Sequence, residues 1–334
     1  SCSVTRQLDA AAMDCGIAIY EHAAYLIGRR PWDVSRDAEL TYRAHAEAYR
    51  RYRHTPVVVS IDIYNLEAEA YGAVVQEPRG DGVPAIMEPL CRSVDEMAQL
   101  PVFDPLTAGR IPMILGVARR LADELPTADI RVPMAGPFSI ASSLLGMEGL
   151  LCEAISRPDE TAAALMHLIE GQEALCRAVL GAGVGVAFFE SAAAPPMLSP
   201  EMFRRVELPA LKAVIQRGSA IMKYPLPCVM GGDTAPVLED LLETGTGYVI
   251  NPIETDQEAF MKKIWDRTDV RVRVNAAPLI MARGSRQEIR DEVERIVGIT
   301  AGRENVCLGT SALPYETPPE NVLWVQELCE QVDR

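Results

Sequence analysis

The sequence predicts a single α/β domain, a (β/α)8 TIM-type barrel that takes up residues 1–334. Strand-like and helix-like segments alternate along the chain, and most of the strand-like segments are almost continuously apolar. Such alternation indicates a parallel sheet, and apolar runs are typical of strands buried on both faces. No Gly-x-Gly-x-x-Gly fingerprint follows a strand. Six or seven strand–helix units in one domain favour a closed barrel over an open sheet.

The predicted strands are short segments rich in β-branched residues. They cover residues 55–63, 130–134, 184–189, 248–251, 270–274 and 305–309. The segment 270–274 departs from the apolar pattern, because Arg271 and Arg273 alternate with valines.

The segments between the strands carry helix start signals. A Ser or Thr followed three residues later by Glu can cap a helix reciprocally. In segment 159–180 the apolar residues recur at helical spacing, with Gly181 as the expected stop. The capping pattern occurs at Ser93/Glu96, Thr255/Glu258, Ser285/Glu288 and Thr317/Glu320.

Composition limits the classes of function. The net charge is −15, from 47 acidic and 32 basic residues, which opposes binding to nucleic acid and to anionic membranes. No apolar run approaches the length of about 18–20 residues that a membrane span needs. The 8 cysteines form no Cys-x-x-Cys pair. We therefore expect a cytoplasmic protein that acts on a small molecule.

Polar residues at the carboxyl ends of the strands are the candidates for function, because barrel active sites are built there. Asp62, Tyr64 and Asn65 follow the first strand. Asp62 interrupts an apolar run, so its burial would need a partner. Asp62 is therefore either a functional residue or a structural one.

Three later strand ends add further candidates. The turn at Gly136-Pro137 opens a helix whose N–H groups either bind an anion or form an ordinary connection. Glu190 follows an apolar strand and precedes small residues. Asp233 follows a Gly-Gly turn and is either functional or a helix cap.

Other residues near these strand ends complete the predicted substrate site. Cys228 is either a ligand contact or an inert buried thiol. None of the four histidines falls at a strand end, which argues against a histidine metal site or a Ser-His-Asp triad. The remaining candidates for substrate binding are Met230, Asn251, Asn275, Ser311 and Tyr315.

Several segments together resemble the superfamily of uroporphyrinogen decarboxylase and the methylcobalamin:coenzyme M methyltransferases. The resemblance implies a deep pocket at the carboxyl ends of the barrel strands and is closer to the methyltransferase branch. The matching segments, in family order, are CSVTRQ, AGRIPMILGVARRL, MAGPFSIASSLLG, LSPEMFRRVELPALK, GGDTAPVLEDLLETG, VNAAPLIMARGSRQEIRDEV and LPYETPPENV.

The chain departs from both branches of this superfamily. Of the decarboxylase motif Arg-Gln-Ala-Gly-Arg-Tyr only Arg6 and Gln7 remain, and the resemblance makes Arg6 a substrate-binding candidate. The methyltransferase branch binds zinc through His-x-Cys and a later Cys, where this chain has Val229, Gly231 and Ser311. Since a catalytic zinc needs about three protein ligands, zinc is not expected.

The resemblance therefore implies a corrinoid-dependent methyltransferase with a non-zinc site. Methylcobalamin would be carried by a partner corrinoid protein, and the chain would pair as a homodimer. The alternatives are a decarboxylase-like lyase for a carboxylated or pyrrolic substrate, and a non-catalytic binding or assembly subunit.

Asp62, Glu190 and Asp233 are the predicted catalytic residues of this methyltransferase. We expect Asp62 and Glu190 to share one pocket, where crowding raises one pKa. We also expect Asp62→Asn to remove activity without lowering stability.

Overall fold

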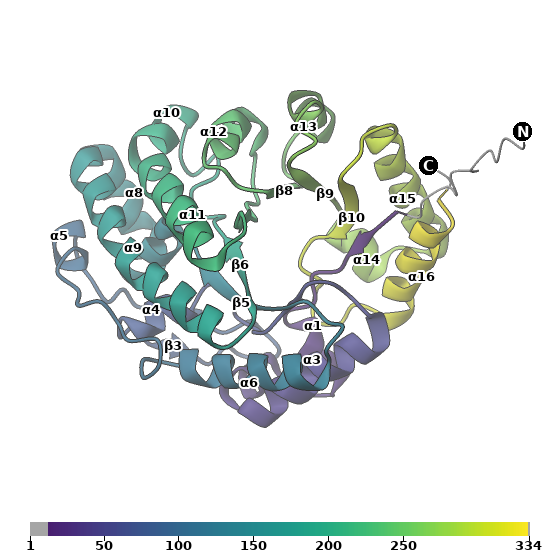
Figure 1. Cartoon of the computed structure of the whole chain (residues 1–334), viewed down its shortest axis with the longest axis horizontal. Helices are drawn as coiled ribbons and strands as arrows, with labels where there is room; N and C mark the ends of the chain where they lie inside the picture. Colours follow the sequence, from purple (N-terminus) through teal and green to yellow (C-terminus); the bar gives the residue numbers. More distant parts are fainter. Residues whose placement is uncertain (1–12, 333–334) are drawn as a thin grey trace, which may run out of the picture.

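Eight parallel strands follow one another around a barrel in the computed structural model, which describes residues 13–332 (Figure 1). Their order around the barrel is β2-β5-β6-β7-β8-β9-β10-β1, as the sequence predicts for this fold. The strands are Cys15–Gly16 (β1), Val57–Val58 (β2), Ile130–Ala135 (β5), Gly185–Phe189 (β6), Pro227–Cys228 (β7), Tyr248–Asn251 (β8), Arg271–Ala276 (β9) and Val306–Thr310 (β10).

The strand ring is weakest at two places. A single bridge between Phe189 and Val229 joins β6 to β7. Within residues 13–332 no backbone ladder joins β1 to β2, so the barrel has a seam there. A separate antiparallel pair, Val75–Gln76 (β3) and Ala85–Ile86 (β4), lies outside the ring.

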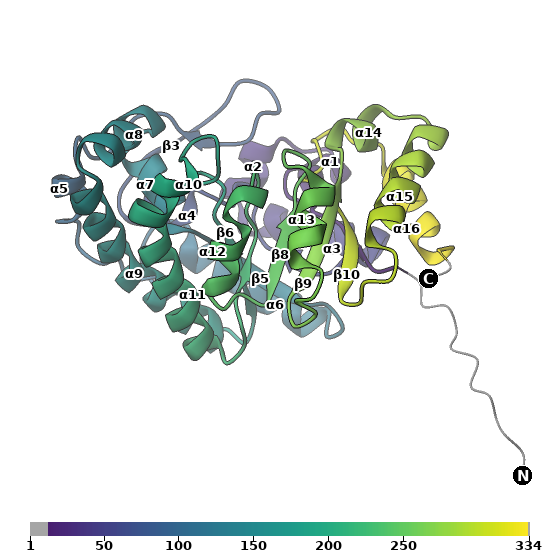
Figure 2. The same cartoon turned by 90° about the horizontal axis from the view of Figure 1, so that it is seen from above.

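Helices surround the strands, as Figures 1 and 2 show for α9, α11, α13 and α15. A π-helix, Phe203–Glu207, leads into α11, and a 3-10 turn, Ala235–Val237, leads into α12. The α-helices are His22–Leu26 (α1), Pro31–Arg36 (α2), Ala38–Tyr52 (α3), Leu66–Ala70 (α4), Val94–Met97 (α5), Ile111–Glu124 (α6), Pro137–Leu145 (α7), Met147–Ser156 (α8), Pro158–Gly181 (α9), Pro200–Met202 (α10), Leu208–Met222 (α11), Leu238–Glu243 (α12), Gln257–Ile264 (α13), Pro278–Arg283 (α14), Arg286–Thr300 (α15) and Pro319–Glu330 (α16).

Two apolar clusters lie between the strands and the helices. One joins β2, β5 and β6 to α6, α9 and α11. The other joins β8, β9 and β10 to α13, α15 and α16. Because successive strand residues point to opposite faces, the other side chains of these strands point into the barrel.

The first predicted strand is much shorter than expected. Of residues 55–63 only Val57 and Val58 pair with a neighbouring strand, β5. Beyond them the Ser60 N–H bonds back to the carbonyl oxygen of Val58. Asp62 therefore lies in the turn after β2 rather than inside a strand.

Two of the four predicted capping boxes are wrong. The reciprocal cap at Ser285/Glu288 is confirmed, and at Ser93 only the serine half forms. Asp256 rather than Thr255 caps α13. Thr317 bonds to the carbonyl oxygen of Pro314, and α16 begins at Pro319.

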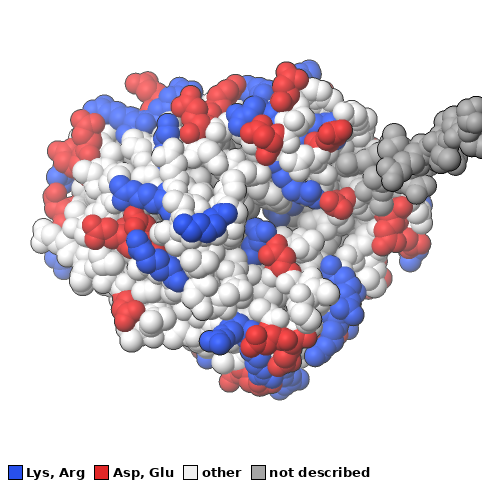
Figure 3. Space-filling model, in the orientation of Figure 1, with Lys and Arg blue, Asp and Glu red and all other residues white. Residues whose placement is uncertain are grey.

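The surface carries both signs of charge in small groups. Figure 3 shows acidic and basic side chains interspersed on one face, which is hollowed near its centre. Among the described helices, no single one is long and apolar enough to cross a membrane. Helices α7 and α8 reach that length and apolarity only together, and the chain bends by 113° between them.

Candidate active site

Asp62 is buried in a double ion pair with an arginine. Nη1 and Nη2 of Arg110, the residue before α6, donate to its two carboxylate oxygens at 2.9 and 2.6 Å. Asn65 donates to the same carboxylate at 2.8 Å, and Glu69 accepts from Nε of Arg110 at 2.6 Å. The prediction that buried Asp62 needs a partner is confirmed. With its oxygens engaged in this way, Asp62 positions Arg110 and Asn65.

Glu190 lies at the tip of β6 and points at the first turn of α7. Its carboxylate accepts from the Phe138 N–H at 3.0 Å and from the N–H and Oγ of Ser139 at 3.1 and 2.5 Å. A Cβ on Gly136 would lie 2.0 Å from Glu190 Oε2, so this approach requires glycine. The sequence offered the start of α7 as an anion site, and the group that binds there is the carboxylate of Glu190.

A second buried carboxyl group, Glu207 at the end of the π-helix, lies beside Glu190. Burial raises the pKa of Glu190 to about 7 against the opposing hydrogen bonds from Ser139. Burial and the charge of Glu190 raise the pKa of Glu207 well above its usual value. The pair therefore holds a proton near neutral pH. The carboxyl group that acts on Glu190 is Glu207, and Asp62 is not among the main causes of the shift. That Asp62 and Glu190 share one pocket stays a prediction.

The thiol of Cys228 belongs to the same buried region. Burial first, and then the charges of Glu190 and Glu207, raise the pKa of Cys228 well above its usual value. A thiol held in its neutral form is a poor nucleophile. Cys228 therefore fits the inert alternative, and Met230 beside it is buried in the core.

A chain of hydrogen bonds crosses the carboxyl ends of β2, β6 and β7. The hydroxyl of Tyr64 donates to Ser191 Oγ at 2.8 Å, and the Gly231 N–H donates to the same oxygen at 3.0 Å. Both lone pairs of Ser191 Oγ are thus used, and its own proton has no acceptor among residues 13–332, so it can donate to a ligand. The sequence pointed to Tyr64 but missed Ser191, which lies directly after Glu190.

Asp233 follows β7 and is half-buried. Its Oδ1 accepts from Thr255 Oγ1 at 2.7 Å. The interpretation of Asp233 as a helix cap is wrong, because the turn at Ala235–Val237 has no side-chain cap. Within residues 13–332, Asp233 Oδ2 has no hydrogen bond, unlike the oxygens of Asp62 and Glu190.

The other substrate-binding candidates differ in what they contact. Asn251 donates to the carbonyl oxygen of Gln257 at 2.9 Å, and Tyr315 donates to that of Arg29 at 2.9 Å, so both side chains tie backbone segments together. Asn275 accepts from Nε of Arg273 at 3.0 Å. The remaining candidate, Arg6, lies outside the described residues.

The three positions that the resemblance assigns to zinc hold no suitable set of ligands. Val229 packs in an apolar cluster with Tyr20 and Phe189 inside the barrel. Gly231 offers only its backbone, and Ser311 Oγ donates to the carbonyl oxygen of Ala276 at 3.4 Å. A zinc site of the family type needs thiolate or imidazole ligands here, so these residues do not fit the ion.

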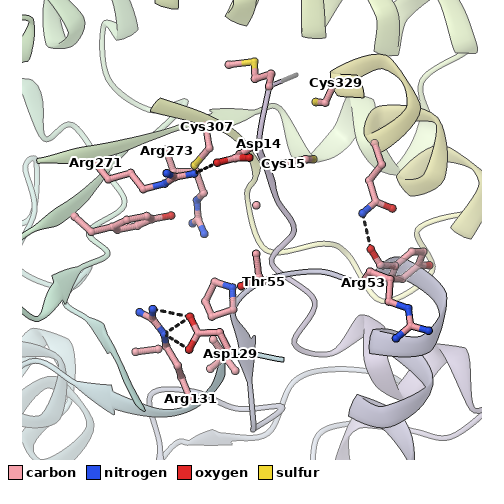
Figure 4. A pocket seen from close by; sticks show the side chains of 18 of the residues that line it. Asp14, Cys15, Arg53, Thr55, Asp129, Arg131, Arg271, Arg273, Cys307 and Cys329 are labelled. Atoms are coloured by element: carbon pink, nitrogen blue, oxygen red, sulfur yellow. Dashed lines mark hydrogen bonds and ion pairs between the residues drawn. The ribbon is translucent and has the colours of Figure 1, made fainter. Parts of the chain in front are cut away.

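A cavity of about 770 Å³ lies at the amino ends of the strands, away from the strand-end candidates (Figure 4). Its lining includes residues at the starts of β1, β5, β8 and β9, together with parts of α3 and α16. Phe189, the last residue of β6, and Val229, directly after β7, also line it. The predicted catalytic and substrate-binding residues within 13–332 do not line this cavity.

The chain belongs to the uroporphyrinogen decarboxylase (URO-D) family, whose sequence profile matches residues 13–332. This confirms the family that the sequence motifs resemble. The profile covers both the strand-end candidates and the cavity residues.

Distant relatives of the chain are methyltransferases. The methylcobamide:CoM methyltransferase MtaA of Methanosarcina barkeri is 26% identical over 222 residues, and that of M. barkeri strain Fusaro / DSM 804 is 27% identical over 223 residues. Each alignment covers 66% of this chain and 63% of the relative. A methyltransferase from Methanosarcina mazei shares the fold, with a TM-score of 0.78 at 18% identity over 97% of this chain and 93% of the other.

Proposed function

We propose that this protein transfers a methyl group between a corrinoid carried by a separate protein and a small molecule. The observation that supports this most is the similarity to methylcobamide:CoM methyltransferases, which extends across 66% of the chain. Membership of the URO-D family and the strand-end hydrogen-bond chain are consistent with a small-molecule site in the barrel.

The proposed site lies at the carboxyl ends of β6 and β7. Asp233 has the free carboxylate oxygen and takes the proton of the methyl acceptor. The hydroxyl of Ser191, oriented by Tyr64 and Gly231, donates to the acceptor and fixes its position. In this scheme Asp62 and Glu190 act through their partners and are positioning residues.

The atoms of the transfer balance without a further reactant. The acceptor loses its proton to Asp233, and its electron pair forms a bond to the methyl carbon. A methylated corrinoid on the partner protein would supply the methyl group and would keep the electron pair of the carbon–cobalt bond. The proton then leaves Asp233 for solvent.

An anaerobic assay tests the proposal. The protein is mixed with methylcobalamin and, in separate reactions, with thiols, amines and phenolates, while the corrinoid spectrum is followed. We expect demethylation with one acceptor class. Asp233→Asn should slow it by about 100-fold or more, since general bases contribute roughly that much.

Glu254→Gln is the matched control, because Glu254 is an exposed carboxylate after the next strand. Its rate should equal that of the unmodified protein. If no acceptor class changes the corrinoid spectrum, the proposal is wrong, and the lyase and binding-subunit alternatives remain. If Asp233→Asn and Glu254→Gln behave alike, the activity stands but Asp233 is not the base.

A further inference from the structure

Arg273 lies in the cavity at the amino ends of the strands and differs from the other deeply buried arginines. Arg110, Arg273 and Arg303 are 7%, 7% and 4% exposed. Arg110 binds two carboxylates and a carbonyl oxygen. Arg303 donates to five backbone carbonyl oxygens. Within residues 13–332, Arg273 pairs with no carboxylate, and the one hydrogen bond of its side chain runs from Nε to the side-chain amide oxygen of Asn275 at 3.0 Å.

The position of the Arg273 side chain is fixed by the strands around it. A Cβ on Gly309 would lie 2.3 Å from Arg273 Cδ, and one on Gly16 would lie 3.1 Å from the same atom. The two glycines therefore leave room for the arginine stem. Since Nε is held by Asn275, the two Nη groups point into the cavity (Figure 4).

Two of the other arginines of the cavity are paired with carboxylates that also line it. Arg271 pairs with Asp14 and Arg131 pairs with Asp129, at 2.5 and 2.7 Å. Five arginines and four carboxylates line the cavity, so its lining has one positive charge in excess. That excess occurs in a chain whose net charge is −15.

Neutral donors and an apolar wall complete the cavity. Burial raises the pKa of Tyr248 to about 12 although Arg273 opposes it, and Tyr20 is raised for the same reason. Both hydroxyls therefore stay protonated and able to donate at neutral pH. Val58, Phe189 and Val229 supply apolar surface.

We propose that this cavity binds a small organic anion, whose carboxylate or phosphate group is held by Nη1 and Nη2 of Arg273. An end-on guanidinium matches two oxygens of either group. A buried guanidinium keeps its charge, and an anion compensates that charge better than an apolar ligand does. The volume of about 770 Å³ suits a small molecule with an apolar body. This site is separate from the strand ends to which we assign methyl transfer.

Calorimetric titration of the full chain with three probes tests the proposal. Benzoate and phenyl phosphate carry the two oxyanions, and benzamide is the neutral analogue of benzoate. We expect at least one anion to bind about tenfold or more tightly than benzamide, since hydrogen bonds between charged groups are worth that much. The stronger of the two anions identifies the oxyanion that the site prefers.

Arg273→Gln should weaken binding of that anion by about tenfold or more and leave benzamide unchanged. Arg204→Gln, at an exposed arginine paired with Asp240, is the control and should bind like the unmodified protein. The variant loses the bond from Nε to buried Asn275, so its melting temperature is measured to show that it is folded. Arg273→Lys keeps the positive charge but lacks the two parallel N–H donors of the guanidinium, so it should also bind the anion more weakly.

The proposal is overturned if the unmodified protein binds neither anion, or binds benzamide as tightly as benzoate and phenyl phosphate. Equal anion binding by Arg273→Gln would also overturn it. The comparison of the three probes on the unmodified protein decides even where a variant does not fold. Methyl transfer is not measured in this experiment, so its result is independent of the proposed activity.

Discussion

Asp62 and Glu190 are buried carboxylates whose burial is compensated in different ways. Asp62 remains paired with a full positive charge from Arg110. Glu190 accepts hydrogen bonds at the start of α7, and burial raises its pKa and that of the neighbouring Glu207. The stability of buried Asp62 depends on the charge of Arg110, whereas the charge of Glu190 and Glu207 depends on pH.

The ion pair predicts that Asp62→Asn destabilises the protein, contrary to what the sequence suggested. The substitution leaves buried Arg110 with Glu69 as its remaining carboxylate partner, and breaking a buried pair costs up to about 3–5 kcal/mol. Urea unfolding measures the change in the free energy of unfolding. Asp95→Asn removes the exposed partner of Arg157 and should change stability little. Equal stability of Asp62→Asn and the unmodified protein would contradict this account.

The Glu190–Glu207 pair predicts a pH dependence of stability. The folded pKa of Glu190 is raised from 4.5 to about 7, so the folded state binds more protons than the unfolded state in that interval. Its contribution is complete below pH 4.5 and is lost as pH rises to about 7. Glu207→Gln, which cannot ionise, should flatten this decline.

Urea unfolding of Glu207→Gln at several values between pH 4.5 and 8 measures that change. Glu201→Gln, at an exposed glutamate in α10, is the control and should keep the decline of the unmodified protein. Parallel pH profiles for Glu207→Gln and the unmodified protein would show that the two carboxyl groups do not interact.

At the scale of elements, β6 and α7 meet where Glu190 contacts the helix start. Gly136 allows this contact, since a side chain there would overlap the carboxylate. We expect Gly136→Ala to cost about 1–3 kcal/mol, as overpacking a filled site does. Gly149→Ala, in α8 with open space around the new methyl group, should be neutral or stabilising by up to about 1 kcal/mol. Similar unfolding free energies for the two variants would argue against the contact.

Elements with a long regular pattern could be predicted from the sequence. Strands β5 and β8 and helix α9 lie where the apolar pattern places them. Strands β1 and β7 have two residues each, too few to show a period. Thr255 was taken for a cap because its spacing fits, but its hydroxyl donates to Asp233, 22 positions away in the chain. Local pattern cannot reveal such a competing partner.

In the sequence, the alternation of Arg271 and Arg273 with valines indicates the cavity that these arginines line. In a barrel strand one face packs on the helices and the other points inside, so alternating arginines mark an inward charge. The partners that define the strand-end site were less accessible to sequence reasoning. Arg110 and Glu207 come from segments remote from Asp62 and Glu190, and only the folded chain brings them together.

At the scale of the whole molecule, the barrel has two chemically different ends. The carboxyl ends of the strands hold the Tyr64–Ser191–Gly231 chain and Asp233. The amino ends enclose the cavity with Arg273. Barrel enzymes place their chemistry at the carboxyl ends. The proposed methyl transfer follows that rule, and the proposed anion site is additional to it.

We propose methyl transfer at a site that does not use the family's zinc ligands. Its most direct test measures zinc content and methylcobalamin demethylation on the same chelator-dialysed sample, with the acceptor found in the panel assay. We predict far less than one zinc per chain and an unchanged rate when zinc is added back, because Val229, Gly231 and Ser311 do not fit the ion. Demethylation that is absent after dialysis and restored in proportion to bound zinc would contradict the account.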